Sequence, residues 1–185
     1  MTVVSFPTDL EKLRRSRPLR KIPIRNPLSV QFLQGPKGIE SPLFAGNPEI
    51  MQDNRSPRVL YIEDHEDTRE LVTLLLNQKS YEVVTGSTIE SGIALAVAQE
   101  FDLYLLDSWL PDGSGLDLCQ RIREFDKTTP ILFYSAAAYA SDHETALRCG
   151  AQAYLTKPSQ PSELCRIVKE LIEESQRTLM ERAMH

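Results

Sequence analysis

Five polar residues of this sequence share one kind of position, because each lies at or just after the end of a short apolar stretch. They are Glu63, Asp64, Asp107, Ser135 and Lys157. Three carboxylates brought together repel one another unless a cation neutralises them, and a hard divalent ion such as Mg²⁺ suits oxygen ligands of this kind. An ammonium and a hydroxyl beside the metal can hold further oxygens of a phosphoryl group. The set therefore predicts a phosphoryl-binding site in which a carboxylate, Asp107, is the nucleophile.

The stretches that precede these residues have the composition of buried β-strands. Apolar, β-branched and aromatic residues predominate in five of them, at residues 58–62, 82–85, 103–106, 130–134 and 152–155. Apolar runs of this length are typical of strands that are covered on both faces. The carboxyl ends of parallel strands meet at one edge of a sheet, and open α/β sheets place their ligand sites there. We therefore expect the five polar residues to meet at that edge.

Amphipathic segments separate the predicted strands. Apolar residues recur at helical spacing in residues 65–79, 88–99, 116–125, 141–149 and from 162 onward. In the first of these segments the apolar positions include Leu71, Val72, Leu74 and Leu75. Strict alternation of five strands with five helices predicts an α/β fold with a parallel sheet, right-handed crossovers and helices on both faces.

Charge and proline content divide the chain near Pro57. Residues 1–57 contain 8 of the 12 prolines and carry a net charge of +4, whereas residues 58–185 carry −9. Because the first segment lacks helical or strand periodicity and cannot bury enough apolar surface, we expect residues 1–57 to be a disordered basic extension. Its basic run, residues 14–25, leaves two interpretations open, a tether to an acidic partner or a solvated tail. Met51 leaves a third, in which translation starts just before the folded part.

Composition narrows the class of protein. The net charge of −5 disfavours a general attraction to nucleic acid, and no apolar run approaches the length of a membrane span, about 20 residues. The first residues lack the apolar stretch of a secretory signal. Cys119, Cys149 and Cys165 show no metal-binding spacing and are expected to be reduced thiols. These features predict a cytoplasmic protein without membrane contact.

Four segments together resemble the response-regulator receiver domains of two-component signalling. They are RVLYIEDHEDTREL, LLDSWLPDGSGLDL, FYSAA and GAQAYLTKP, and they follow one another in the family's order and at family-like spacing. The resemblance covers residues 58–175. It implies a flavodoxin-like (βα)5 doubly wound sheet with strand order 2-1-3-4-5 and a site at its switch point. Residues 176–185 are expected to extend the final helix.

The resemblance also implies a role for each site residue. Asp107 is the expected phosphoacceptor, and Ser135 and Lys157 are expected to hold phosphoryl oxygens. Mg²⁺ is the implied cofactor, and its implied ligands are Asp64, Asp107 and the backbone carbonyl of Trp109, with Glu63 acting through a water on the metal. Such a domain is not an enzyme toward other substrates, because it catalyses only its own phosphorylation and dephosphorylation.

A conformational switch is a further implication of the resemblance. Tyr154 matches the aromatic residue that changes rotamer in receivers when the loop after Ser135 moves. By itself, Tyr154 is equally compatible with an ordinary amphipathic edge position. The face implied to change comprises the fourth helix, fifth strand and fifth helix, and it is also a candidate homodimer face. The bond between Lys157 and Pro158 is expected to be cis, as in the family.

One residue, Trp109, departs from the commonest pattern of the family. Trp109, two residues after the acceptor, carries no acid or amide that could orient a hydrolytic water, and Ala137, two residues after Ser135, adds no polar group. The indole can also shield an acyl phosphate. We therefore expect a long-lived phosphorylated form.

Two hypotheses of function follow from the sequence. In the first, the chain is a stand-alone receiver, because only 28 residues follow Lys157 and these predict one helix rather than a DNA-binding domain. It accepts its phosphoryl group from a histidine kinase or a histidine phosphotransfer protein and signals to a downstream protein partner, without direct contact with DNA. In the second, the receiver fold is a phosphorylation-independent scaffold or binding module. The complete set of site residues favours the first.

Overall fold

The computed structural model describes residues 55–137 and 139–184. The extension predicted for residues 1–57 lies outside the described residues except for its last three. One of these three, Arg55, donates two hydrogen bonds to the carboxylate of Asp102, at 2.8 and 2.9 Å. The disorder expected for the rest of the extension stays a prediction.

Five parallel strands form the central sheet, in the order β2-β1-β3-β6-β7. Their bounds are β1 Arg58–Ile62, β2 Glu82–Gly86, β3 Leu103–Leu106, β6 Ile131–Ser135 and β7 Ala153–Thr156. Counted within this sheet alone, the order is 2-1-3-4-5, so the predicted flavodoxin-like arrangement is confirmed. All four residues of β3, the middle strand, are buried, as expected for a strand with helices on both faces.

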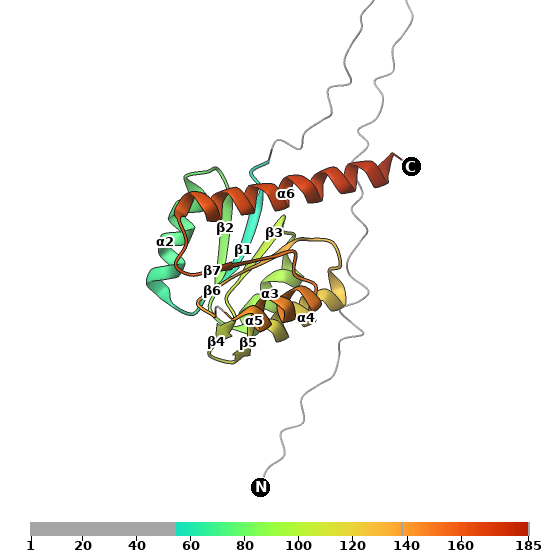
Figure 1. Ribbon diagram of the computed structural model, residues 1–185. Coiled ribbons are helices and arrows are strands. Elements are labelled where there is room, and N and C mark those ends of the chain that lie inside the picture. Colours follow the sequence, from blue (N-terminus) through green and yellow to red (C-terminus); the bar gives the residue numbers. More distant parts are fainter. Residues whose placement is uncertain (1–54, 138, 185) are drawn as a thin grey trace, which may run out of the picture. The chain divides into compact units, whose positions relative to one another are not determined.

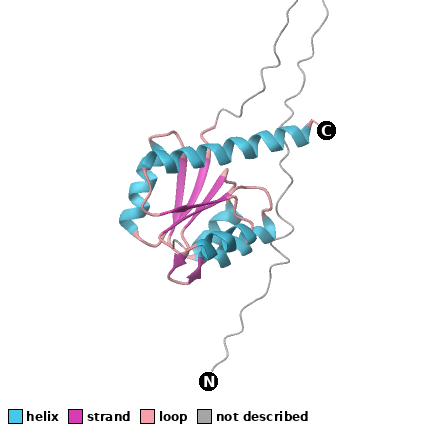
Figure 2. Ribbon diagram, in the orientation of Figure 1, coloured by secondary structure: helices cyan, strands magenta, loops and turns pink. Residues whose placement is uncertain are grey.

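Helices cover the two faces of the sheet (Figures 1 and 2). Their bounds are α2 Glu66–Asn77, α3 Ile89–Ala98, α4 Gly115–Phe125, α5 Ala140–Arg148 and α6 Pro161–Ala183. Because successive strand residues point to opposite faces, the core has two halves. On one face α3, α4 and α5 pack against residues such as Leu60 and Leu106. On the other face α2 and α6 pack against Val59 and Leu105.

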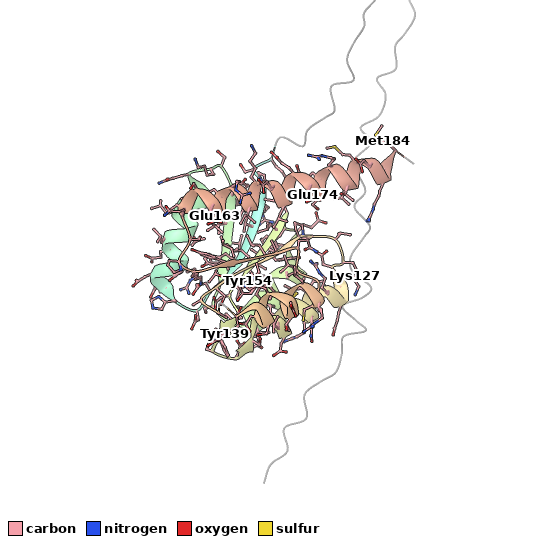
Figure 3. All side chains as sticks on the ribbon, viewed as in Figure 1. Lys127, Tyr139, Tyr154, Glu163, Glu174 and Met184 are labelled. Carbon is pink, nitrogen blue, oxygen red and sulfur yellow. The ribbon has the colours of Figure 1, made fainter. Side chains whose placement is uncertain are left out.

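Local sequence signals set the helix boundaries close to where they were expected. The hydroxyl of Thr88 accepts the N–H of Ser91 at 3.0 Å and so caps α3. Gly150, with φ of +99°, follows α5 and has the left-handed conformation that commonly ends a helix. α6 begins at Pro161 and runs unbroken to Ala183, so the expected extension is a direct continuation of this helix. Figure 3 shows Met184 at its far end.

The buried face of α2 differs from the one that the leucine spacing indicated. Leu71 and Leu74 are 68% and 58% exposed, whereas Val72 and Leu76 are buried. Residues four apart lie on one side of a helix, so Val72 and Leu76 form a single inward stripe. Periodicity could not select this stripe, because apolar residues in this segment occupy several faces at once.

A short antiparallel pair lies in the segment after β3, where the sequence indicated only a turn. It consists of β4 Trp109–Leu110 and β5 Gly113–Ser114. All three cysteines are free thiols, as expected. Within the described ranges, no helix is both long and apolar enough to cross a bilayer.

Candidate functional site

The carboxyl ends of four strands bring four of the predicted side chains to one edge of the sheet. Glu63 directly follows β1, Asp107 follows β3, Ser135 ends β6, and Lys157 follows β7. β1 and β3 end in register with one another, so the acids that follow them lie at the same level. Glu63, Asp107 and Ser135 are only 3%, 6% and 0% exposed. Buried polar groups of this kind need partners, which the site itself provides.

Lys157 joins the two buried acids. Its ammonium donates hydrogen bonds to Glu63 Oε2 and, at 3.0 Å, to Asp107 Oδ1. Burial opposes the charge on the ammonium, but the hydrogen bond to Glu63 and the charge of Asp107 outweigh it and raise the pKa of Lys157 above its ordinary value. The peptide bond between Lys157 and Pro158 is cis, as expected. Lys157 is therefore a fixed positive charge beside Asp107.

Tyr61 is a partner of this site that the sequence analysis missed. Its hydroxyl donates to Glu63 Oε2 at 2.8 Å, and the whole residue is inaccessible to solvent. Burial and the adjacent Glu63 carboxylate raise the pKa of Tyr61 far above its ordinary value, so this hydroxyl keeps its proton. The signal was present in the sequence, since residues two apart in a strand point to the same face.

Ser135 ends β6, which pairs with β3 on the side away from β1. Its hydroxyl oxygen accepts the N–H of Ala137 at 3.4 Å, and its backbone carbonyl accepts the N–H of Lys157 at 2.8 Å. The second contact ties the end of β6 to the residue that bears the ammonium. Any shift of the Ser135 segment is therefore coupled through the main chain to Lys157.

The oxygen atoms expected to bind Mg²⁺ are only partly gathered. Glu63 and Asp107 are both bonded to Lys157, whereas Asp64 is exposed. Across residues 55–137 and 139–184, no group of three His, Cys, Asp or Glu side chains is arranged to hold a metal as it stands. The donor chemistry nevertheless fits: the two carboxylates of Glu63 and Asp107 share one ammonium, and the excess negative charge on their hard oxygen atoms is what Mg²⁺ neutralises.

Glycine permits the close approach of α4 to Asp107. A Cβ at Gly115 would lie 1.9 Å from the backbone oxygen of Asp107, and the N–H of Gly115 donates to the carbonyl of Ser108 at 2.9 Å. On the same loop, the N–H of Trp109 donates to Asp107 Oδ2 at 2.8 Å. The indole of Trp109 itself is 69% exposed. The carboxylate is thus oriented from one side by a backbone amide and from the other by Lys157.

Tyr154 connects the loop after β3 with the loop after β6. Its hydroxyl donates to the carbonyl of Ala137 at 2.7 Å and lies 3.3 Å from the hydroxyl of Ser108, next to Asp107. Its ring is stacked between Phe133, at 5.8 Å, and His143, at 4.1 Å. The ring of Tyr154 therefore contacts both β6 and α5. This position suits a residue that responds to the loops, although rotamer change itself stays a prediction.

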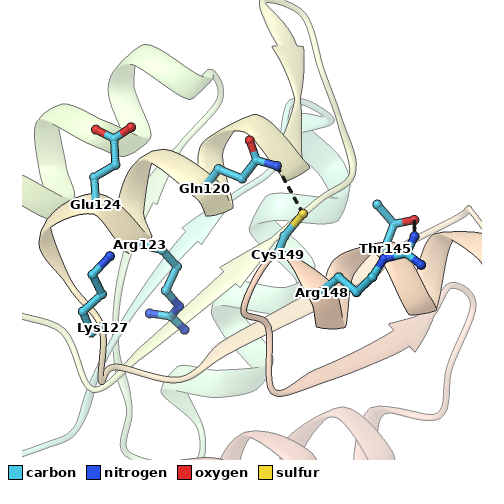
Figure 4. A pocket seen from close by; sticks show the side chains of 7 residues that line it. All are labelled: Gln120, Arg123, Glu124, Lys127, Thr145, Arg148 and Cys149. Carbon is cyan, nitrogen blue, oxygen red and sulfur yellow. Dashed lines mark hydrogen bonds between the residues drawn. The ribbon is translucent and has the colours of Figure 1, made fainter.

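A polar groove of about 490 Å³ lies between α4 and α5 (Figure 4). Gln120, Arg123, Arg148 and Cys149 contribute to its wall. Arg123 is already used structurally, since it donates to the carbonyls of Gly150 and Asp126. None of the predicted site residues lines this groove.

The similarity to known proteins covers the folded part of the chain. Transcriptional regulatory protein DltR of Streptococcus agalactiae is 36% identical over 107 residues, which are 58% of this chain and 48% of DltR. Regulatory protein VanR of Enterococcus faecium is 36% identical over 114 residues, 62% of this chain and 49% of VanR. The chain thus spans about half the length of the curated relatives it matches.

Solved structures show the same similarity. The non-phosphorylated HemR receiver domain from Leptospira biflexa is 34% identical, with a TM-score of 0.60, and the match covers 63% of this chain and 94% of that domain. The family model described as response regulator receiver domain matches residues 59–169. This match agrees with the order of the strands and with the acids at the carboxyl edge of the sheet. The chain belongs to the response-regulator receiver domain family.

Proposed function

We propose that this receiver domain accepts a phosphoryl group on Asp107 from a phosphohistidine of a histidine kinase or of a histidine phosphotransfer protein. The observation that carries the proposal is the contact between Asp107 and Lys157. A buried carboxylate at the end of the middle strand has an ammonium 3.0 Å from one oxygen. A preorganised cation beside the attacked group stabilises the charge of a transferring phosphoryl group.

In the proposed transfer, a carboxylate oxygen of Asp107 attacks phosphorus. The new O–P bond forms while the N–P bond of the phosphohistidine breaks, and the freed imidazole nitrogen takes up a proton. The ammonium of Lys157 and the hydroxyl of Ser135 then hold oxygens of the phosphoryl group. The domain is both acceptor and catalyst in this proposal, and no activity toward other substrates is included.

We assign Mg²⁺ to Glu63, Asp64, Asp107 and the backbone carbonyl of Trp109. When bound, the cation supplies positive charge that offsets the repulsion between the carboxylates and the incoming phosphoryl oxygens. The chain's own contribution is orientation. Asp107 Oδ2 is held by the N–H of Trp109 at 2.8 Å, so the carboxylate keeps one geometry during the approach of the donor.

The proposed output is a change on the face formed by α5, β7 and α6. Ser135 and Tyr154 are the proposed switch residues, because the Tyr154 hydroxyl contacts Ala137 in the loop that follows Ser135. A protein partner, or a second copy of the chain, would read this face. The curated relatives named as transcriptional regulators share only the receiver half, so we propose no DNA contact for residues 58–175. The stand-alone arrangement stays a prediction, tested by the mass of the native protein.

The test is phosphorylation by acetyl phosphate with Mg²⁺, followed by intact mass measurement of wild type and Asp107→Asn. We expect a gain of one phosphoryl group in wild type only, and its loss when Mg²⁺ is chelated. Glu163→Gln, on the exposed start of α6, is the matched control and should be phosphorylated like wild type. Absence of the adduct from wild type would contradict the proposal and favour the phosphorylation-independent scaffold.

A further inference from the structure

The two carboxylate oxygens of Glu63 accept hydrogen bonds from different donors. Oε2 accepts from Tyr61 and from Lys157, whereas Oε1, among residues 55–137 and 139–184, accepts only the N–H of His65, at the long distance of 3.4 Å. Oε1 is therefore the oxygen left for a cation or its water. The Glu63 side chain is only 4% exposed, so solvent is a poor replacement for a donor that Oε2 loses.

Phosphorylation, as proposed above, moves the ammonium of Lys157 toward a phosphoryl oxygen. Lys157 already lies between Glu63 and Asp107, so a phosphoryl group on Asp107 competes with Glu63 for the same donor. A buried carboxylate oxygen that loses its partner destabilises the state in which the loss occurs. Something must therefore satisfy Glu63 Oε2 after Lys157 has turned away.

We infer that Tyr61 is a positioning residue that keeps Glu63 Oε2 hydrogen-bonded when Lys157 transfers to the phosphoryl group. This inference rests on the proposed function and deepens it. The tyrosine hydroxyl lies 2.8 Å from Oε2 and already donates to it, and Tyr61 belongs to β1, in which residues 59–62 are fully buried. Its contribution is small while Lys157 is present and large once Lys157 has left, so Tyr61 favours the phosphorylated state selectively.

The same sheet contains a matched control. Tyr104 is also completely buried, and its hydroxyl donates at 2.9 Å to a carboxylate, that of Asp126. This pair lies outside the site. The backbone N–H of Tyr104 donates to the carbonyl of Pro130, and Tyr104 is paired with Ile131, the first residue of β6, whereas the site lies where the strands end. Tyr104→Phe therefore removes a bond of the same type without touching the ligands.

The experiment measures two affinities by the fluorescence of Trp109, the only tryptophan of the chain. The first titration uses Mg²⁺ alone, and the second uses beryllofluoride, a phosphoryl analogue, at saturating Mg²⁺. In Tyr61→Phe we expect Mg²⁺ affinity within about twofold of wild type and beryllofluoride affinity weakened about tenfold, the effect of one hydrogen bond to a charged group. Tyr104→Phe should leave both affinities within about twofold of those of wild type, even if it lowers the stability of the fold.

A background of Glu63→Gln isolates the contact. There the side chain is neutral, so adding Tyr61→Phe should change beryllofluoride affinity by less than about twofold. Equal weakening of both affinities in Tyr61→Phe, or no weakening of either, would overturn the inference, and so would an undiminished effect in the Glu63→Gln background. Wild type that binds no beryllofluoride and gains no phosphoryl mass would instead refute the proposed function.

Discussion

Replacing Lys157 with methionine is expected to destabilise the fold and to make its stability depend on Mg²⁺. The substitution keeps an unbranched side chain of similar length but removes the ammonium. Two carboxylates with side chains only 4% and 9% exposed, those of Glu63 and Asp107, then lose their shared cation. Tyr61 and two backbone amides remain as donors, and none of them carries charge.

The magnitude follows from the burial of the pair. Removing one partner of a buried ion pair typically costs about 3–5 kcal/mol, whereas a surface pair contributes about 0–1 kcal/mol. The Lys157 side chain is itself 16% exposed, so we take the lower end, about 3 kcal/mol. A divalent cation can replace the lost charge, and a ligand that binds only the folded state stabilises that state by mass action. Millimolar Mg²⁺ should therefore stabilise the variant more than it stabilises wild type.

Urea unfolding with EDTA or with Mg²⁺ measures both effects. Lys169→Met is the matched control, because Lys169 is 64% exposed and its ammonium is 3.7 Å from Glu173 in a surface ion pair. The control should lose less than about 1 kcal/mol and respond to Mg²⁺ as wild type does. The reasoning is wrong if Lys157→Met unfolds in EDTA at the same urea concentration as the control, or if Mg²⁺ stabilises it no more than wild type.

Three further substitutions test other parts of the structure. Burial opposes ionisation of Asp126, but amide and hydroxyl donors led by Thr129 hold its pKa below the ordinary 3.8. Asp126→Asn should therefore cost about 1–2 kcal/mol at neutral pH, and pH-dependent urea unfolding should show this deficit shrinking as the pH falls through and below 3.8. Trp109→Asn supplies an amide that can orient water, so phosphorylated protein should lose its phosphoryl mass about tenfold faster than wild type, and equal lifetimes would contradict the shielding hypothesis. Gly115→Ala places a methyl group against the backbone of Asp107 and should cost at least about 3 kcal/mol in urea unfolding; near wild-type stability would show that α4 can shift freely.

The alternation of strands and helices, and with it the sheet, followed from the sequence alone. Apolar runs such as residues 103–106 are too short for helices and too apolar for exposed strands, so their composition predicted buried strands. The length of the helical segments that connect them predicted a parallel sheet. Polar residues follow these runs, so the sequence alone predicted Asp107 and Lys157 at one edge of the sheet. The family motifs then supplied the strand order, which the structure confirms.

Only the tertiary structure decided which side chains meet. The leucines of α2 were visible in the sequence, but packing against the sheet and α6 selected Val72 and Leu76 and left Leu71 and Leu74 in solvent. The site acids were likewise predicted as a cluster around a metal, whereas Lys157 pairs with Glu63 and Asp107 and leaves Asp64 exposed. The bond from Tyr61 to Glu63 depends on the strand pleat and on burial that excludes water. Spacing along a chain fixes which residues can face the same way, but the distances between elements, and therefore the hydrogen bonds, arise only when those elements pack.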